Sequence, residues 1–116
     1  MEITIKSLET KTHPETKKLF WFVFAATRGG MNRIRIISHL RNMPSNTHQI
    51  ANSIGLDYKG VQHHLKNLEQ NNLVTKVGSN YGVTYFPSVL FEDSEAVFDE
   101  ILSKLKKVGN NLVKAF

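Results

Sequence analysis

Apolar residues recur through the middle of the chain at intervals of three and four positions, the spacing of an α-helix with one buried face. The pattern predicts four successive helices, over about residues 14–26, 32–42, 47–54 and 58–70. Residues that commonly begin or end helices stand between them. Pro14 opens the first helix, Pro44 follows the second, and Asn71-Asn72 follows the fourth.

The pattern changes after the fourth helix. Residues 73–77 and 83–86 are short β-prone runs joined by five turn-forming residues, which predicts a hairpin. A further helix is expected from residue 93 or 94 to about residue 108, with acids in its early turns and lysines in its last, as the helix dipole favours. Residues 3–5 alternate like a strand, although a frayed arm fits them equally well.

The order of these elements is typical of a winged helix-turn-helix domain. Asn46 and Gln49 have the spacing of a capping box at the start of the short helix, and Gly55 can adopt the backbone angle of the sharp turn after it. We therefore expect a mainly α fold with a small β-hairpin, a winged helix-turn-helix with additional N- and C-terminal helices. The expected organisation is an arm or short strand over 1–13, the winged domain over 14–90, and a C-terminal helix over 91–116.

Composition limits the class of protein. A chain of 116 residues, 41% hydrophobic, can fill one core, and the absence of cysteine excludes disulfides, thiolate metal sites and cysteine nucleophiles. The longest apolar run, residues 19–26, is far shorter than the roughly 20 residues that cross a bilayer. We expect a cytoplasmic protein with no membrane partner.

Positive charge is concentrated in one segment. The net charge is +5, and residues 28–81 hold seven cations against two acids, so that this segment alone carries +5. The flanking segments nearly cancel, at +1 for residues 1–27 and −1 for residues 82–116. The middle of the chain is therefore the part expected to meet a polyanion.

The stretch FVFAATRGGMNRIRIISHLRNMPSNTHQIANSIGLDYKGVQHHLKNLEQNNLV resembles the ArsR-like winged-helix transcriptional regulators abundant in archaea. The part LDYKxVxHHLxxLExNxLV is the most specific, and the resemblance covers roughly residues 19–90. It implies a nucleoid-associated homodimer that binds double-stranded DNA sequence-specifically, usually as a repressor. Metal-sensing members rely largely on cysteine-containing sites, so metal sensing is not carried over.

The helix over 58–70 can be divided into faces, since successive residues are about 100° apart. With Val61 at the centre of the buried face, Leu65 and Leu68 also point inward, and His64 borders the core. Four side chains point outward or lie on the shoulder and are the candidates for reading DNA bases: Lys59, Gln62, His63 and Lys66. A solvated surface histidine is the alternative for His63, whereas His64 is expected to pack and hydrogen-bond within the fold.

Two other features of this helix invite a functional interpretation. Adjacent histidines diverge by about 100° on a helix, and no two of the five histidines are three or four residues apart, so we expect no metal and no cofactor. Gly60 stands where many relatives have Thr or Ser. It could allow a close approach of the backbone to DNA, or be a tolerated weak point, since glycine costs a helix about 1 kcal/mol relative to alanine.

Phosphate contacts are expected around this helix. Candidates lie before the second helix or on its surface, at the start of the short helix, at the first residue of the fourth helix, and on the hairpin: Arg28, Arg33, Arg35, Thr47, His48, Gln49, Tyr58, Lys76, Ser79, Asn80 and Tyr81. For the arginines and the hairpin, ordinary solvated residues are the alternative.

The ends of the chain are expected to form the dimer. Apolar residues of the last helix recur as a heptad-like seam, and the first helix is rich in aromatic residues. The expected interface residues are Phe20, Trp21, Phe24, Phe98, Ile101, Leu105, Val108 and Leu112. The alternative is that both helices complete the core of the monomer.

The expected function is sequence-specific binding of double-stranded DNA by a homodimer that regulates transcription as a repressor. No enzyme activity is expected, because the sequence contains no phosphate loop, no nucleophile elbow and no paired carboxylates in a recognisable setting. A winged-helix protein–protein interaction module is the alternative, and an RNA-binding winged helix is third. The excess of positive charge in residues 28–81 favours nucleic acid, and the lack of an aromatic stacking surface disfavours single-stranded RNA.

Overall fold

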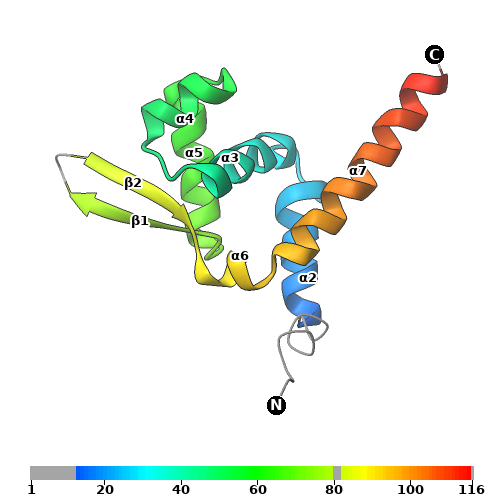
Figure 1. Ribbon diagram of the computed structural model, residues 1–116, viewed down its shortest axis with the longest axis horizontal. Helices are drawn as coiled ribbons and strands as arrows, with labels where there is room; N and C mark the ends of the chain where they lie inside the picture. The colour runs from blue at the N-terminus through cyan, green and yellow to red at the C-terminus, as the bar shows by residue number, and fades with distance from the viewer. Residues whose placement is uncertain (1–12, 80–81, 116) are drawn as a thin grey trace.

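The structure of the protein is a computed structural model that describes residues 13–79 and 82–115, with side chains up to Val108. Its elements along the chain are α2 (Pro14–Trp21), the π-helical turn η1 (Phe22–Ala26), α3 (Gly30–Asn42), α4 (Thr47–Ile54), α5 (Tyr58–Gln70), β1 (Val74–Ser79), β2 (Gly82–Pro87), α6 (Val89–Asp93) and α7 (Glu95–Ala115). Figure 1 shows α3, α4 and α5 as one bundle, with the hairpin on one side and α2 and α7 on the other. None of the described helices is long and apolar enough to span a membrane.

The predicted fold class, a mainly helical winged helix-turn-helix with one β-hairpin, is confirmed. The helix predicted over 58–70 has those bounds, and the predicted capping box at Asn46 and Gln49 is present, as is the left-handed backbone of Gly55 at φ 70°. The first helix differs, because its last turn widens into η1. The short helix α6 was not predicted: it has five residues, and the hydroxyl of Ser88 caps it by accepting a hydrogen bond from the amide of Phe91 at 3.0 Å.

The wing is a two-stranded antiparallel hairpin with a third segment beside it. Lys76 pairs with Tyr85 in the register of β1 and β2, and the chain after α3 adds an isolated bridge between Ser45 and Tyr85. Backbone hydrogen bonds in both directions, at 2.8 and 3.3 Å, form this bridge. The hairpin is thereby attached to the helical bundle at β2, next to the start of α4.

An aromatic cluster joins the two ends of the chain within one subunit. Phe20 stacks on Phe91 with ring centroids 5.8 Å apart, Phe24 meets Phe98 edge-on at 5.0 Å, and Phe91 meets Phe98 at 5.1 Å. Ile101 is fully buried in the same core. The prediction that Phe20, Phe24, Phe98 and Ile101 form a dimer interface is therefore wrong, because the first half of α7 packs on α2 and η1 of its own subunit.

An ion pair also ties α7 to the bundle. Arg41 on α3 donates to Asp99 at 2.9 Å, lies 3.8 Å from Glu95, and sits over the ring of Phe98. This arginine belongs to the basic middle segment, yet its charge is matched by α7. It contributes to the attachment of α7 rather than to a surface for a polyanion.

Gly30 allows α3 to begin directly against η1. A Cβ built on Gly30 would overlap the carbonyl oxygen of Phe24 and lie 2.8 Å from the carbonyl carbon. This carbonyl cannot rotate away, because it belongs to the backbone. We expect Gly30→Ala to lower the free energy of unfolding by about 2 kcal/mol, measured by urea denaturation.

Gly60→Ala is the matched control. The Cβ built there meets the end of the Asp57 side chain, which can move, and alanine favours the helix. If Gly60→Ala lowered the free energy of unfolding as much as Gly30→Ala, the close approach of the backbone at Gly30 would not be the cause of the destabilisation.

Candidate nucleic-acid interface

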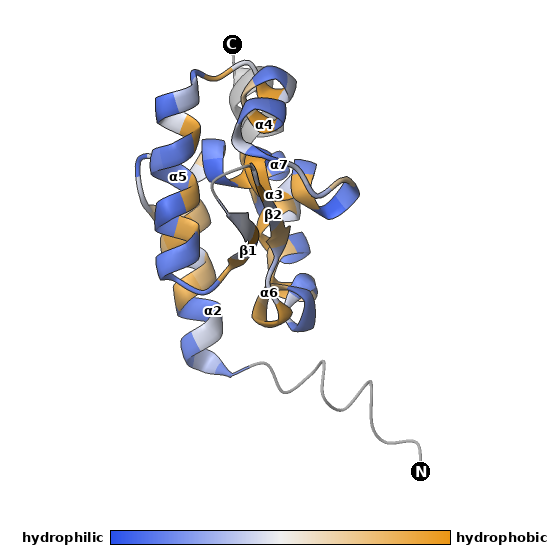
Figure 2. Cartoon of the chain, turned by 90° about the vertical axis from the view of Figure 1, so that its left-hand side faces the viewer, coloured by the Kyte–Doolittle hydropathy of each residue, from blue (hydrophilic) through white to orange (hydrophobic). Residues whose placement is uncertain are grey.

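Helix α5 presents a polar face outward. The side chain of Asp57 caps it by accepting a hydrogen bond from the amide of Gly60 at 3.2 Å, and the buried side chains Val61, Leu65 and Leu68 hold it against the bundle. Figure 2 shows hydrophilic colour along the outer side of this helix. The predicted outward residues, Lys59, Gln62, His63 and Lys66, are all exposed. Their predicted orientation is confirmed, and their contact with DNA bases stays a prediction.

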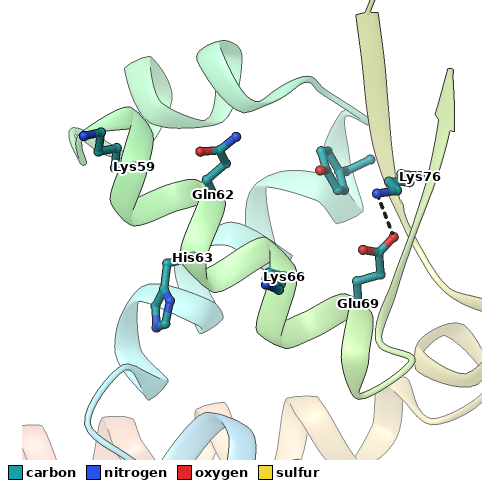
Figure 3. Close-up of a pocket in the computed structure, with 7 residues that line it drawn as sticks. Lys59, Gln62, His63, Lys66, Glu69 and Lys76 are labelled. Carbon is teal, nitrogen blue, oxygen red and sulfur yellow. Dashed lines mark ion pairs between the residues drawn. The ribbon is translucent and has the colours of Figure 1, made fainter. Parts of the chain in front are cut away.

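The outward residues of α5 form one wall of a groove, and the hairpin forms the other (Figure 3). The groove has a volume of about 450 Å³ and is lined by Lys59, Gln62, His63, Lys66, Glu69, Lys76 and Tyr85. Three lysines and one glutamate give its lining a charge of +2. Its surface is therefore suited to a polyanion, with amide and imidazole groups among the cations.

A second groove of about 610 Å³ continues the first toward α4 and the wing. It shares Gln62, Lys76 and Tyr85 with the first groove. Its other described lining residues are Asn46, Thr47, His48, Tyr58, Gly78, Ser79, Gly82 and Val83. The start of α4, the start of α5 and the wing thus border one continuous surface.

The rings of His48 and Tyr58 pack against each other with centroids 4.5 Å apart. They join the first turns of α4 and α5, where backbone N–H groups lack helical partners and attract anions. Both residues were predicted to lie near phosphate, and the structure brings them together at the edge of the second groove. Thr47, also predicted, lines this groove although most of its side chain is buried.

Two residues in the groove were missed from the sequence. Glu69 pairs with Lys76 at 3.5 Å, and so links the last turn of α5 to the wing (Figure 3). Tyr85 lies opposite Lys76 in the strand register and lines both grooves. Alternation along a strand predicts which residues of that strand share a face. The register of the hairpin was needed to place Tyr85 of β2 opposite Lys76 of β1.

The predicted arginines separate into different environments. Arg28 is exposed and lines neither groove, and Arg35 donates to the carbonyl of Ile54 at the end of α4. Arg33 is only 5% exposed, so the prediction that it contacts phosphate is wrong. Gln49 uses its side-chain oxygen to accept from the amide of Asn46 at 2.8 Å. The predicted residues Asn80, Tyr81 and Leu112 lie outside the described residues or side chains.

Arg33 is held by groups of three elements. Its Nε donates to the carbonyl of Val23 at 2.9 Å, its Nη2 donates to the hydroxyl of Thr27, and its Nη1 lies 3.3 Å from Nδ1 of His64. Burial lowers the pKa of Arg33 from its ordinary value. Burial, and then the charges of Arg33 and His63, lower the pKa of His64. The predicted packing and hydrogen bonding of His64 within the fold are thus confirmed.

Gly60 leaves room for the cap of α5. A Cβ at this position would lie 2.8 Å from Oδ1 of Asp57, whose carboxylate accepts from the Gly60 amide. Because this oxygen ends a side chain that can move, the contact does not by itself require glycine at the position. Close approach of the Gly60 backbone to DNA stays a prediction.

The described part of the chain contains no group of three metal-ligating side chains arranged to hold an ion. The rings of His63 and His64 lie edge to face, with centroids 5.5 Å apart and planes at 63°. The chemistry that the surface offers is therefore hydrogen bonding and charge attraction.

Residues 31–76 match the family model described as bacterial regulatory protein, arsR family. They run from the first turn of α3 to the third residue of β1 and include α4 and α5. A comparison with curated protein sequences found no match.

Solved structures share the fold over most of their length. The AntR antimony-specific transcriptional repressor superposes with a TM-score of 0.62 at 15% identity, over 90% of this chain and 86% of that one. The transcriptional regulator HlyU of Vibrio vulnificus gives 0.58 at 20% identity, over 87% and 96%. The homodimeric winged helix-turn-helix DNA-binding domain Mb0332 of Mycobacterium bovis gives 0.54 at 14% identity, over 88% and 85%.

At these identities the structural likeness shows the fold alone. Residues 31–76, which are similar to the arsR-family model, lie within this winged helix-turn-helix fold and include α4 and α5.

Proposed function

We propose that the protein is a cytoplasmic homodimer that binds double-stranded DNA sequence-specifically and represses transcription from the promoter it occupies. The observation that carries this proposal is the basic groove between α5 and the wing, lined by three lysines together with Gln62 and His63. A major groove admits one α-helix, and amide and imidazole groups can read the base edges there. Lysines on the same face supply the charge attraction to phosphate.

In this arrangement α5 is the recognition helix and the wing lies along the adjacent backbone. Lys59, Gln62, His63 and Lys66 are the proposed base-reading residues, since they project from the outer face of α5. Proposed phosphate contacts come from the second groove and its rim: Thr47, His48, Tyr58, Lys76 and Ser79. Arg28 and Arg35 are exposed but line neither groove, so their predicted contacts with phosphate are not part of this proposal.

The proposed dimer uses the part of α7 that the core does not cover. Beyond Ile101 this helix extends away from the bundle (Figure 1). Met31, Ile34, Leu102 and Leu105 line an apolar groove of about 230 Å³ between α3 and α7, and Val108 lies one turn beyond Leu105. A projecting helix with an apolar side is stabilised when a second copy covers it.

In this proposal the dimer represses transcription by occupying the promoter. Two recognition helices related by a two-fold axis would contact half-sites about one helical turn apart, and a dimer bound across a promoter excludes polymerase from it. The protein needs no catalytic group for this activity.

Binding to duplex DNA should weaken steeply with salt, because lysine–phosphate contacts release counterions. Lys66→Ala should reduce the slope of log affinity against log salt by about 1, measured by fluorescence anisotropy over a series of salt concentrations. The physical reason is the loss of one cation from the groove, because the ammonium group of Lys66 attracts nearby phosphates in addition to its proposed contact with a base.

Lys17→Ala is the matched control, since it removes the same charge from an exposed position on α2 outside both grooves. Its slope should equal that of the wild type. Affinity that is indifferent to salt, or equal slopes for all three proteins, would contradict the assignment of the groove to DNA.

A further inference from the structure

Arg33 connects the recognition helix to the rest of the fold without touching the proposed DNA surface. It lies on α3, and its three partners are Val23 in η1, Thr27 after η1, and His64 on α5. Among the described residues no carboxylate forms an ion pair with it. A buried guanidinium must then be satisfied by neutral acceptors, and each of the three has to keep its place.

The contact with His64 requires a particular form of the imidazole. All guanidinium nitrogens donate hydrogen bonds and none accepts, so Nδ1 of His64 must carry a free lone pair at 3.3 Å from Nη1 of Arg33. His64 is therefore neutral in this arrangement. A proton on Nδ1 would place two donors and two positive charges against each other.

The backbone at Gly29 lies close to both side chains. A Cβ built on Gly29 would lie 2.6 Å from Cε1 of His64 and would also overlap Arg33, so the ring and the guanidinium both pack against this glycine. His64 is a residue of α5, next to His63 and Leu65 in the sequence. A disturbance at His64 therefore acts on the helix that carries Gln62, His63 and Lys66.

We propose that Arg33 is a positioning residue for the recognition helix, which it holds through neutral His64, and that a proton on Nδ1 of His64 releases this hold and weakens DNA binding. The proposal rests on the proposed function, since the measured activity is DNA binding. It extends that function by assigning a role to Arg33, which lies outside the DNA surface, and to the neutral form of His64.

The direction of the pH effect follows from the charges around His64. Arg33 on α3 and His63 on α5 are the charged or titratable groups that act on it, and both disfavour the imidazolium, as does burial, so that the pKa is lowered from 6.5. The neutral form is thus favoured by the fold. The contribution of neutral His64 to holding the recognition helix is present above about pH 6.5, and it is lost as the pH falls through the lowered pKa of His64.

His48 and His63 also carry imidazoles, and they line the proposed DNA surface. The pH dependence of DNA binding by the wild type therefore does not report on His64 alone. The contribution of His64 has to be separated with a variant that cannot titrate at this position.

The experiment compares the wild type with His64→Gln, whose amide oxygen can accept from Arg33 at any pH. The dissociation constant for one duplex is measured for both proteins at about pH 7.5 and at a pH below the midpoint of the His64 ring titration, at constant salt. We expect the ratio of the wild-type Kd to the variant Kd to rise by at least about threefold on acidification. The same rise is expected in a His63→Gln background, where His63 no longer contributes. A ratio that is the same at both pH values overturns the proposal.

Titration of the wild type by NMR tests the coupling without DNA and does not depend on the variant folding. The amides of Val23, Thr27 and Gly29 should shift along the titration curve of the His64 ring. Titration of His64 without those shifts overturns the proposal. Coupled shifts without any duplex binding at pH 7.5 would instead count against the proposed function and leave the Arg33–His64 link standing.

Discussion

Replacing Met31 and Val108 together with glutamate is expected to convert the proposed dimer to a monomer and to weaken binding to a palindromic duplex by at least about 100-fold. These side chains are 59% and 55% exposed, so the substitutions leave the core of the subunit intact. Charges placed on the apolar side of α3 and α7 oppose the burial that the dimer needs. Light scattering coupled to size exclusion measures the mass, and anisotropy measures the affinity.

Met43→Glu with Val89→Glu provides a control of the same composition. These two residues are 56% and 73% exposed, and they lie after α3 and on α6, away from the groove between α3 and α7. The control adds the same negative charge, so it corrects for simple repulsion from DNA. A Met31/Val108 variant that stays dimeric would remove this face from the proposed interface.

Gln62→Ala and His63→Ala are each expected to relax base preference at particular positions of the site, at a cost of about 1–3 kcal/mol for a good contact. Loss of a hydrogen bond to a base edge should affect the preferred base and leave the other bases at that position nearly unchanged. Competition of every single-base variant of the site against the parent duplex measures this directly.

Gln70→Ala is the matched control for Gln62. It lies on the same helix, is exposed, and lines neither groove. Its base preferences should equal those of the wild type. If Gln62 and His63 variants also keep the wild-type preferences, these residues do not read bases.

The recognition helix was predictable from sequence because its signals are local. Asp57 caps it, Val61 and Leu65 repeat with the period of a helix, and Asn71 follows its last residue. A helical wheel therefore separated His63 from His64 correctly. Both residues have the orientations that the 100° step requires.

The burial of Arg33 was not predictable in the same way. Its position between apolar residues of α3 is compatible with either a surface or an interior cation, and the decision depends on tertiary partners. The carbonyl of Val23 lies in the π-helical turn that ends the preceding helix, and the hydroxyl of Thr27 comes directly after that turn. Nothing in the local sequence identifies that turn.

The last helix shows how a regular pattern can have two uses. Phe98, Ile101, Leu105 and Val108 follow one seam, yet the first two are buried in the subunit and Val108 is exposed. Periodicity indicates an apolar side and leaves open which element covers it. Here the short helix α6, also missed, turns the chain so that the start of α7 meets α2 and η1.

The most direct test of the central claim is selection of bound sequences from a random duplex library with the purified full chain. The account predicts enrichment of a pseudo-palindromic site whose half-sites are about 10 base pairs apart, centre to centre. No enrichment over the starting library, or enrichment of a single asymmetric site, would contradict sequence-specific binding by a two-fold dimer.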